Sequence, residues 1–260
     1  SRDDENPPKG FAGETIDVPV RRIVCMSSSY VAFLEALGAD STICAISGTG
    51  YIWSDKVRNR IAGGEIAEAG FDNSLNFEKL VALKPDVVFL YGLTGKNAVT
   101  DKLHELGLKT VYIGDYVENN PLGRAEWITV FGEFTGRREL ARTLFDSISN
   151  EYNRAKALVS GVEKRPEVML NAPWQDSWFV PGDRSYMVRL LEDAGGNYAC
   201  RGVDSDQSRP ISTETAFVAA SQSDFWLSPG TATSLAELNA MNPRFGSIPP
   251  VRNGNVYNNN

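Results

Sequence analysis

Histidine and cysteine are the residues that this sequence has least of. His104 is the only histidine, and the three cysteines, Cys25, Cys44 and Cys200, lie far apart with no C-x-x-C pair. Protein zinc sites need several histidine or cysteine ligands at short spacing. Cys25 and Cys44 each lie in an apolar run, which favours buried free thiols. We therefore expect no bound metal ion and no resident cofactor.

Motifs for catalysis and for nucleotide binding are incomplete. Gly48-Thr49-Gly50 starts like a dinucleotide loop, but Trp53 stands where a third glycine is needed. The segment 92–97 resembles a phosphate loop but is too short, and Asn97 replaces the Ser or Thr that binds magnesium. We expect no enzymatic activity, and a metal- or nucleotide-dependent enzyme on a Rossmann-like fold is the alternative from another class.

Positive charge and long apolar runs are also in short supply. The formal net charge is −7, from 33 acidic and 26 basic residues, so a nucleic-acid phosphate backbone is repelled on average. No apolar run is long enough to span a bilayer, and the sequence does not start with a signal peptide. The chain is therefore either cytosolic or a mature form whose targeting segment has been removed.

Short apolar runs alternate with stretches of helical periodicity in both halves of the chain. After a polar, Pro- and Gly-rich start, predicted as a flexible tail over 1–20, this alternation predicts a parallel α/β lobe over 21–135. A second α/β lobe is predicted over 161–260. Residues 136–160 carry one apolar stripe at steps of three or four, which predicts a single long helix between the lobes. The stripe consists of Leu140, Leu144, Ile148, Tyr152, Ala155 and Val159.

Large aromatic residues follow the predicted strands in both lobes. Tyr51, Trp53 and Tyr91 do so in the first lobe, and the segment 173–178, with two tryptophans, does so in the second. In parallel α/β folds the ligand crevice lies at the carboxyl ends of the strands. Aromatic side chains bury much area at little entropy cost, so they suit a flat or bulky ligand.

One segment is specific enough to indicate a family. Residues 76–88, N-F-E-K-L-V-A-L-K-P-D-V-V, resemble the N-L-E-x-I-x-A-L-K-P-D-L-V element of the substrate-binding proteins of ABC importers for vitamin B12, ferric siderophores and haem. The segments 22–27, 212–214 and 223–227 resemble further elements of that family. The similarity covers roughly residues 20–258. It implies an α/β fold of two Rossmann-like lobes with parallel sheets, joined by one long interlobe helix.

The resemblance also implies partners and a location. Family members present one glutamate from each lobe to arginines of the membrane permease, and Glu78 and Glu214 fall on those positions. The implied protein is a periplasmic or extracytoplasmic monomer. Its acidic start, Asp3-Asp4-Glu5, suits the tether of a lipoprotein, although the sequence contains no N-terminal cysteine for acylation.

The ligand implied by the resemblance is a small metal chelate. We favour an iron chelate of the siderophore type, with a cobalamin or other corrinoid as the alternative and haem as a further one. The residues predicted to stack on the ligand are Trp53, Tyr91, Trp174 and Trp178, and those predicted to make polar contacts are Tyr51, Gln175 and Arg209.

Overall fold

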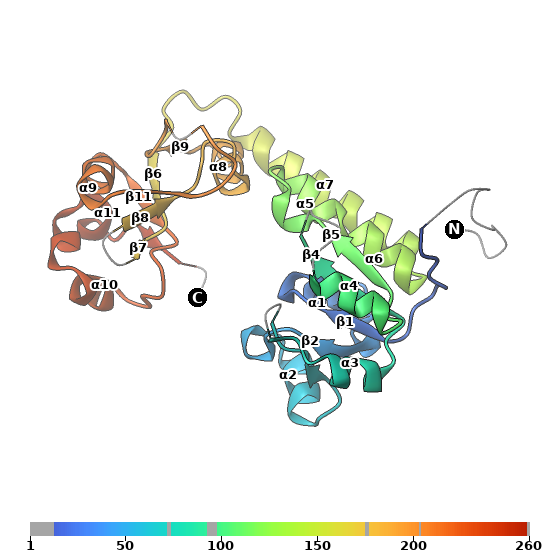
Figure 1. Ribbon diagram of the computed structural model, residues 1–260. Helices are drawn as coiled ribbons and strands as arrows, with labels where there is room; N and C mark the ends of the chain where they lie inside the picture. The colour runs from blue at the N-terminus through green and yellow to red at the C-terminus, as the bar shows by residue number, and fades with distance from the viewer. Residues whose placement is uncertain (1–12, 72–73, 93–97, 175–176, 203, 259–260) are drawn as a thin grey trace. The chain divides into compact units, whose positions relative to one another are not determined.

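The computed structural model describes residues 13–71, 74–92, 98–174, 177–202 and 204–258. The chain divides into two compact units. The first contains residues 1–117 and 125–148, and the second contains residues 118–124 and 149–260. Both are α/β units with a parallel sheet, as predicted (Figure 1).

The first unit is built on a five-stranded parallel sheet in the order β3-β2-β1-β4-β5. Its strands are β1 (Ile23–Cys25), β2 (Ile43–Ile46), β3 (Ala67–Glu68), β4 (Val87–Tyr91) and β5 (Thr110–Ile113). Its helices are α1 (Ser28–Ala36), α2 (Asp55–Ala62), α3 (Phe77–Leu83), α4 (Ala98–Glu105) and α6 (Ile128–Thr135).

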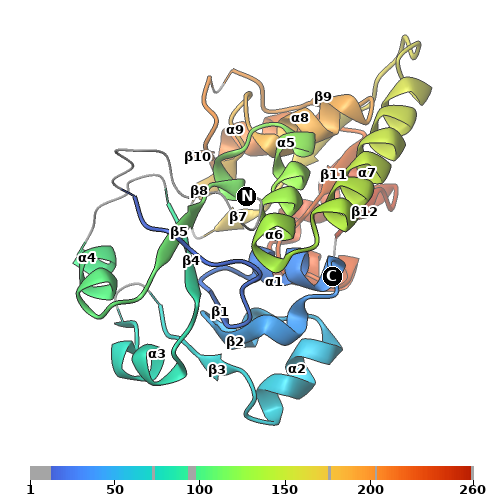
Figure 2. The same cartoon turned by 90° about the vertical axis from the view of Figure 1, so that its right-hand side faces the viewer.

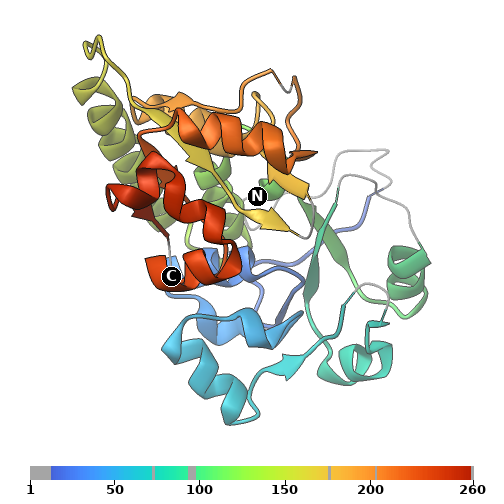
Figure 3. The same cartoon turned by 90° about the vertical axis from the view of Figure 1, so that its left-hand side faces the viewer.

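Helices cover both faces of this sheet. Successive strand residues point to opposite faces, so alternate residues of one strand belong to different cores. Val87 and Phe89 belong to a core with α1, α2 and α6. Val88 and Leu90 belong to a second core with α3 and α4. Figures 2 and 3 show α3 and α4 on one side of the sheet and α1 and α6 on the other. Burial on both faces explains why residues 87–90 form a continuous apolar run.

The second unit contains a four-stranded parallel sheet and a smaller antiparallel one, with the orders β12-β11-β6-β9 and β10-β8-β7. The parallel strands are β6 (Glu167–Leu170), β9 (Asn197–Tyr198), β11 (Phe225–Leu227) and β12 (Val256–Tyr257). The antiparallel strands are β7 (Pro173–Trp174), β8 (Ser177–Val180) and β10 (Arg209–Ser212). The helices are α8 (Tyr186–Asp193), α9 (Thr213–Ser221), α10 (Leu235–Met241) and α11 (Pro249–Arg252). The sequence did not predict the antiparallel sheet.

The two units repeat one local arrangement. Asp86 stands directly before β4, and its Oδ2 accepts a hydrogen bond from the Arg22 amide at 2.9 Å. Asp224 stands directly before β11, and its Oδ2 accepts from the Glu167 amide at 2.9 Å. In each case the neighbour precedes or begins the adjacent first strand of the unit, β1 or β6. In both units, an aspartate before one central strand is therefore hydrogen-bonded to the start of the neighbouring central strand, β4 to β1 and β11 to β6.

The predicted long helix is confirmed as α7 (Arg138–Leu158). Its C-terminal part is tied to α8 within the second unit, because Tyr152 Oη donates to Asp193 Oδ2 at 2.8 Å and Lys156 Nζ lies 2.8 Å from Asp193 Oδ1. The segment before α7 forms two helices, α5 (Pro121–Glu126) and α6.

The buried line on α7 differs from the predicted apolar stripe. Leu144 of the predicted stripe packs against the first core, but Leu140 and Ile148 are exposed. Ala141 is fully buried and Phe145 packs against the same core, and neither was predicted. The physical reason is a close approach of α6, because a Cβ on Gly132 would lie only 2.5 Å from the Ala141 Cβ. Only small residues fit at this helix crossing, so alanine takes the central position.

We expect Gly132→Ala to destabilise the protein by about 1–3 kcal/mol, because the added methyl overpacks the α6–α7 contact. Gly161→Ala is the matched control, since nothing lies within 4 Å of the new Cβ. It should change the free energy of unfolding by less than about 0.5 kcal/mol. Equilibrium urea unfolding measures both, and equal effects would contradict the close helix contact.

Candidate functional site

The strand order of the first unit reverses between β1 and β4, and such a switch point is where open α/β sheets bind ligands. Ser27 caps α1 at this point, and its Oγ accepts from the Ser29 amide at 3.3 Å. Tyr30 is fully buried behind it and donates to the carbonyl oxygens of Leu90 at 3.3 Å and Ile113 at 3.4 Å. Burial raises the pKa of Tyr30 far above its ordinary value, so this phenol stays a neutral donor that joins the ends of β4 and β5.

Exposed aromatic side chains gather at the carboxyl edge of this sheet. Trp53 is 86% exposed, Tyr51 70% and Tyr91 43%, so all three predicted residues of the first unit offer surface to a ligand. Phe71 is 51% exposed and comes just after β3. It was not predicted, because β3 has only two residues and leaves no strand pattern in the sequence.

The loop that carries Tyr51 and Trp53 is held by a carboxylate. Glu68 ends β3, and its Oε1 accepts from the amides of Gly48 and Gly70, both at 2.9 Å. Its Oε2 accepts from the Thr49 amide at 2.8 Å and from Thr49 Oγ1 at 2.7 Å. Partial burial by itself raises the pKa of Glu68, but the hydrogen bonds from Thr49, Gly48 and Gly70 outweigh it. They hold the pKa below its ordinary value.

The second unit has its own switch point, between β6 and β11. The residue after each strand, Asn171 with φ 62° and Ser228 with φ 56°, is in the left-handed region that non-glycine residues seldom adopt. Asn171 is held there, because its carbonyl accepts from Trp226 Nε1 at 2.6 Å and its amide donates to the Leu227 carbonyl at 3.1 Å. Strained backbone of this kind gathers at functional sites.

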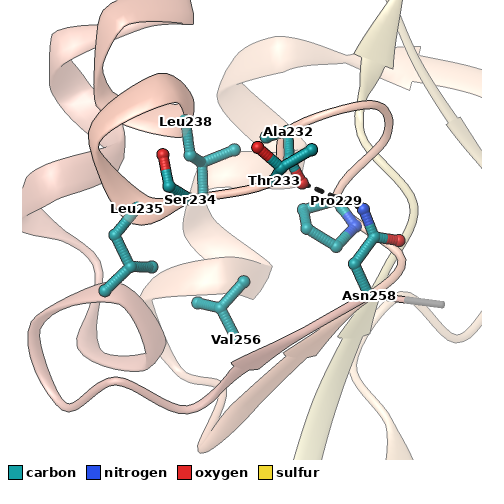
Figure 4. Close-up of a pocket in the computed structure, with 8 residues that line it drawn as sticks. All are labelled: Pro229, Ala232, Thr233, Ser234, Leu235, Leu238, Val256 and Asn258. Atoms are coloured by element: carbon teal, nitrogen blue, oxygen red, sulfur yellow. Dashed lines mark hydrogen bonds between the residues drawn. The ribbon is translucent and has the colours of Figure 1, made fainter. Parts of the chain in front are cut away.

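A pocket of about 400 Å³ lies at the end of β12 in this unit. Leu235, Leu238 and Val256 give it an apolar wall, and Thr233 and Ser234 add hydroxyls (Figure 4). The Asn258 amide closes one end, where it donates to the Ala232 carbonyl at 3.1 Å.

The aromatic residues predicted in the second unit have different outcomes. Trp178 is completely buried, so the expectation that it stacks on a ligand is wrong. It lies on β8, where inward positions alternate with outward ones, and its Nε1 donates to the Leu170 carbonyl at 3.2 Å. Its ring packs 5.4 Å from that of Trp226, measured between centroids.

The structure describes the other predicted residues of this unit only in part. Trp174 is on β7, but only its backbone is among the described parts of the chain, and Gln175 lies outside the described residues. Arg209 is exposed and begins β10, opposite Val180 of β8.

Glu78 and Glu214 occupy equivalent places in their own units. Each is the second residue of a helix, after the caps Asn76 and Ser212, and each is exposed. Helix α3 leads into β4 and helix α9 leads into β11, and both of these strands flank a switch point. Because a helix that precedes a parallel strand begins at the carboxyl edge of the sheet, each glutamate stands at the edge that carries the candidate site of its unit.

The remaining titratable groups form no second centre in the described part of the chain. No group of three or more His, Cys, Asp or Glu side chains comes close enough there to hold a metal ion. The three cysteines are free and buried, and burial raises the pKa of Cys200 to about 11. Among the described residues, no helix has both the length and the apolar character that crossing a bilayer requires.

The chain belongs to the periplasmic binding protein family, whose model matches residues 23–259. An uncharacterized lipoprotein of Methanocaldococcus jannaschii is 28% identical over 94% of this chain, and the chain spans 60% of that relative's length. A periplasmic haem-binding protein of Vibrio cholerae has a similar fold, with a TM-score of 0.72 and 18% identity over 91% of this chain and 88% of that one. A periplasmic vitamin B12-binding protein of the same organism gives a TM-score of 0.66 and 13% identity over 93% and 88% of the two chains.

We expect Trp178→Ala to lower the stability of the protein by about 3–5 kcal/mol, because it leaves a large cavity among packed rings. Trp53→Ala should change the stability by less than about 0.5 kcal/mol, because this side chain is almost fully exposed. Chemical denaturation of both variants tests the assignment. Two variants as stable as the parent would place Trp178 outside the core.

Proposed function

We propose that the protein is the extracytoplasmic substrate-binding protein of an ABC importer, which captures an iron chelate of the siderophore type and delivers it to a membrane permease. The observation that carries this proposal is the group of exposed aromatic side chains, Tyr51, Trp53 and Tyr91, at the carboxyl edge of the first sheet. Side chains of this size are ordinarily buried, and exposed aromatic patches mark binding sites. The proposed role is capture and delivery, without catalysis.

Flat or bulky ligands suit these residues. Aromatic rings offer wide faces to a conjugated or macrocyclic ligand. In the second unit, the exposed Arg209 is a cation of the kind that favours an anionic chelate. The haem- and vitamin B12-binding proteins of similar fold support a metal chelate as the ligand class. A corrinoid is the alternative within this class, and haem is a further one. A Rossmann-like enzyme is the alternative outside it, and turnover or nucleotide binding would identify one.

Glu78 and Glu214 are the proposed contacts to the permease. Two exposed carboxylates at equivalent positions of two units form a matched pair of charges, and such pairs fix the register of an interface. Their position in a first helical turn also stabilises each helix by roughly 0.3–1 kcal/mol through the helix dipole. The proposed location is outside the cytoplasmic membrane, with a lipid anchor, in line with the lipoprotein relative.

We expect ligand binding to quench tryptophan fluorescence and to bury Trp53. Titration with a ferric hydroxamate siderophore, haemin and cyanocobalamin identifies which probe binds the parent protein. Trp53→Ala and Tyr91→Ala should then each weaken the binding of that probe by about 1–3 kcal/mol, as the loss of an aromatic anchor does. Leu158→Ala removes an exposed apolar side chain from α7 and serves as the control. Unchanged binding in both aromatic variants would contradict the proposed site.

Reversing the two docking charges should separate delivery from capture. In Glu78→Lys with Glu214→Lys, we expect ligand affinity to stay within about twofold of the parent. Stimulation of the permease ATPase and uptake into proteoliposomes should be lost, because like charges then face each other at the interface.

The control has the same change in net charge. Glu139 is the second residue of α7, and Glu105 is an exposed residue of α4. Glu139→Lys with Glu105→Lys should leave both ligand affinity and uptake near parent levels. Equal loss of uptake in the two double variants would show a general charge effect, and the docking assignment would then be wrong.

A further inference from the structure

We propose that Glu68 is a positioning residue that holds the aromatic loops of the first unit in their binding conformation before a ligand arrives. The part of this inference that concerns ligand affinity rests on the function proposed above. The structural part stands on the contacts within the first unit alone.

Glu68 joins two loops that follow different strands. Its Oε1 receives the amide of Gly48, in the loop after β2, and the amide of Gly70, in the loop after β3, each at 2.9 Å. Its Oε2 receives two bonds from Thr49, as described above. β3 is the edge strand of the sheet and has only two residues, so few ladder bonds hold these loops. The carboxylate therefore adds a side-chain connection to the backbone bond from the Ala69 amide to the Ile46 carbonyl.

The joined loops bring two exposed rings to the same glycine. Gly48 is in the left-handed region, with φ 74°, and a Cβ at this position would meet the Tyr51 ring at 2.9 Å and the Phe71 ring at 3.3 Å. The two rings thus close over the same glycine, one from each loop. Tyr51 was predicted to contact a ligand, and the structure adds Phe71 beside the same glycine.

Only a carboxylate can make all four bonds. Each oxygen accepts from two donors, and every partner is an N–H or O–H group. A glutamine would replace one oxygen with an NH₂ group, which would face two donors and leave them without an acceptor. A donor that loses its acceptor and stays away from water costs free energy, so the substitution destabilises the loops. The four donors around position 68 therefore require a carboxylate, and a neutral side chain of the same size cannot replace it.

Loops that are already ordered raise the affinity, because the entropy cost of ordering the rings does not then reduce the free energy gained on binding. A receptor with loose loops makes the same contacts in the complex but binds more weakly. The effect of Glu68 on a ligand is thus indirect, through the conformation of Tyr51 and Phe71.

The test compares Glu68→Gln with Glu65→Gln, the same substitution at an exposed residue three positions earlier whose carboxylate pairs with Arg60 at 3.0 Å. In the ligand-free protein, NMR measures hydrogen exchange at the amides of Gly48, Thr49 and Gly70. It also measures the approach of the Tyr51 and Phe71 rings to the Gly48 Hα, which we call the ring contact. In Glu68→Gln we expect these amides to exchange at least about tenfold faster and the ring contact to disappear. Glu65→Gln should match the parent, and so should the melting temperature of both variants within a few degrees.

Thr49 provides a second, milder pair. Thr49→Ser keeps the hydroxyl that bonds Glu68 Oε2, and Thr49→Val removes it while keeping the branched shape. Faster exchange in Thr49→Val with parent-like exchange in Thr49→Ser supports the assignment even where Glu68→Gln folds poorly. Parent-like exchange and an intact ring contact in both Glu68→Gln and Thr49→Val would overturn it.

The ligand arm uses whichever of the ferric hydroxamate siderophore, haemin and cyanocobalamin binds the parent. Glu68→Gln should weaken that binding by at least about tenfold, and Thr49→Ser should not. Loosened loops with unchanged affinity would overturn the positioning role. If the parent binds none of the three probes, the proposed function fails, and the ligand-free exchange and ring contact still decide whether Glu68 holds the loops.

Discussion

The candidate site of the first unit depends on the register of β4 against β1. Asp86 fixes that register, since its Oδ2 accepts from the Arg22 amide and its own amide donates to the Arg22 carbonyl at 2.8 Å. A slip by one residue would exchange the faces of Val88 and Phe89, and both cores would lose their fit. It would also turn the Tyr91 side chain to the opposite face of the sheet. Asp224 makes the equivalent pair of bonds with Glu167 in the second unit, which explains why an aspartate precedes a central strand in both.

Local chemistry determined which parts of the fold could be predicted. The bounds of α3 can be read from the sequence, because Asn76 caps the helix, with Oδ1 accepting from the Lys79 amide at 3.0 Å, and Pro85 follows it. The long helix α7 was predicted for a similar reason. Its buried face was predicted only in part. Leu144 packs against the core as the stripe predicts, whereas the burial of Ala141 is set by Gly132 on another helix, which no pattern within α7 records.

The candidate site shows the same division between local and distant causes. Tyr51, Trp53 and Tyr91 follow strands that are visible in the sequence, and all three are exposed where predicted. Trp178 was misplaced, because the hairpin of β7 and β8 is too short to show an alternating pattern. With four residues in β8, the inward direction of Trp178 depends on its pairing with β10. The role of Glu68 was missed for a further reason, since its four donors come from loops up to 20 residues away.

Glu68 and Glu78 show how one residue type takes two roles at the same edge of a sheet. The carboxylate of Glu68 is half-buried. Its Oε1 accepts from two N–H groups, and its Oε2 accepts from an N–H and an O–H group, so its charge is stabilised within the unit. Glu78 is exposed at the start of α3, where water and the helix dipole are compatible with its charge. A charge already satisfied by backbone donors attracts a partner weakly, whereas a solvated charge on a helix start is available to an arginine. The number of donors that each carboxylate already accepts from therefore distinguishes the proposed positioning residue, Glu68, from the proposed docking residue, Glu78.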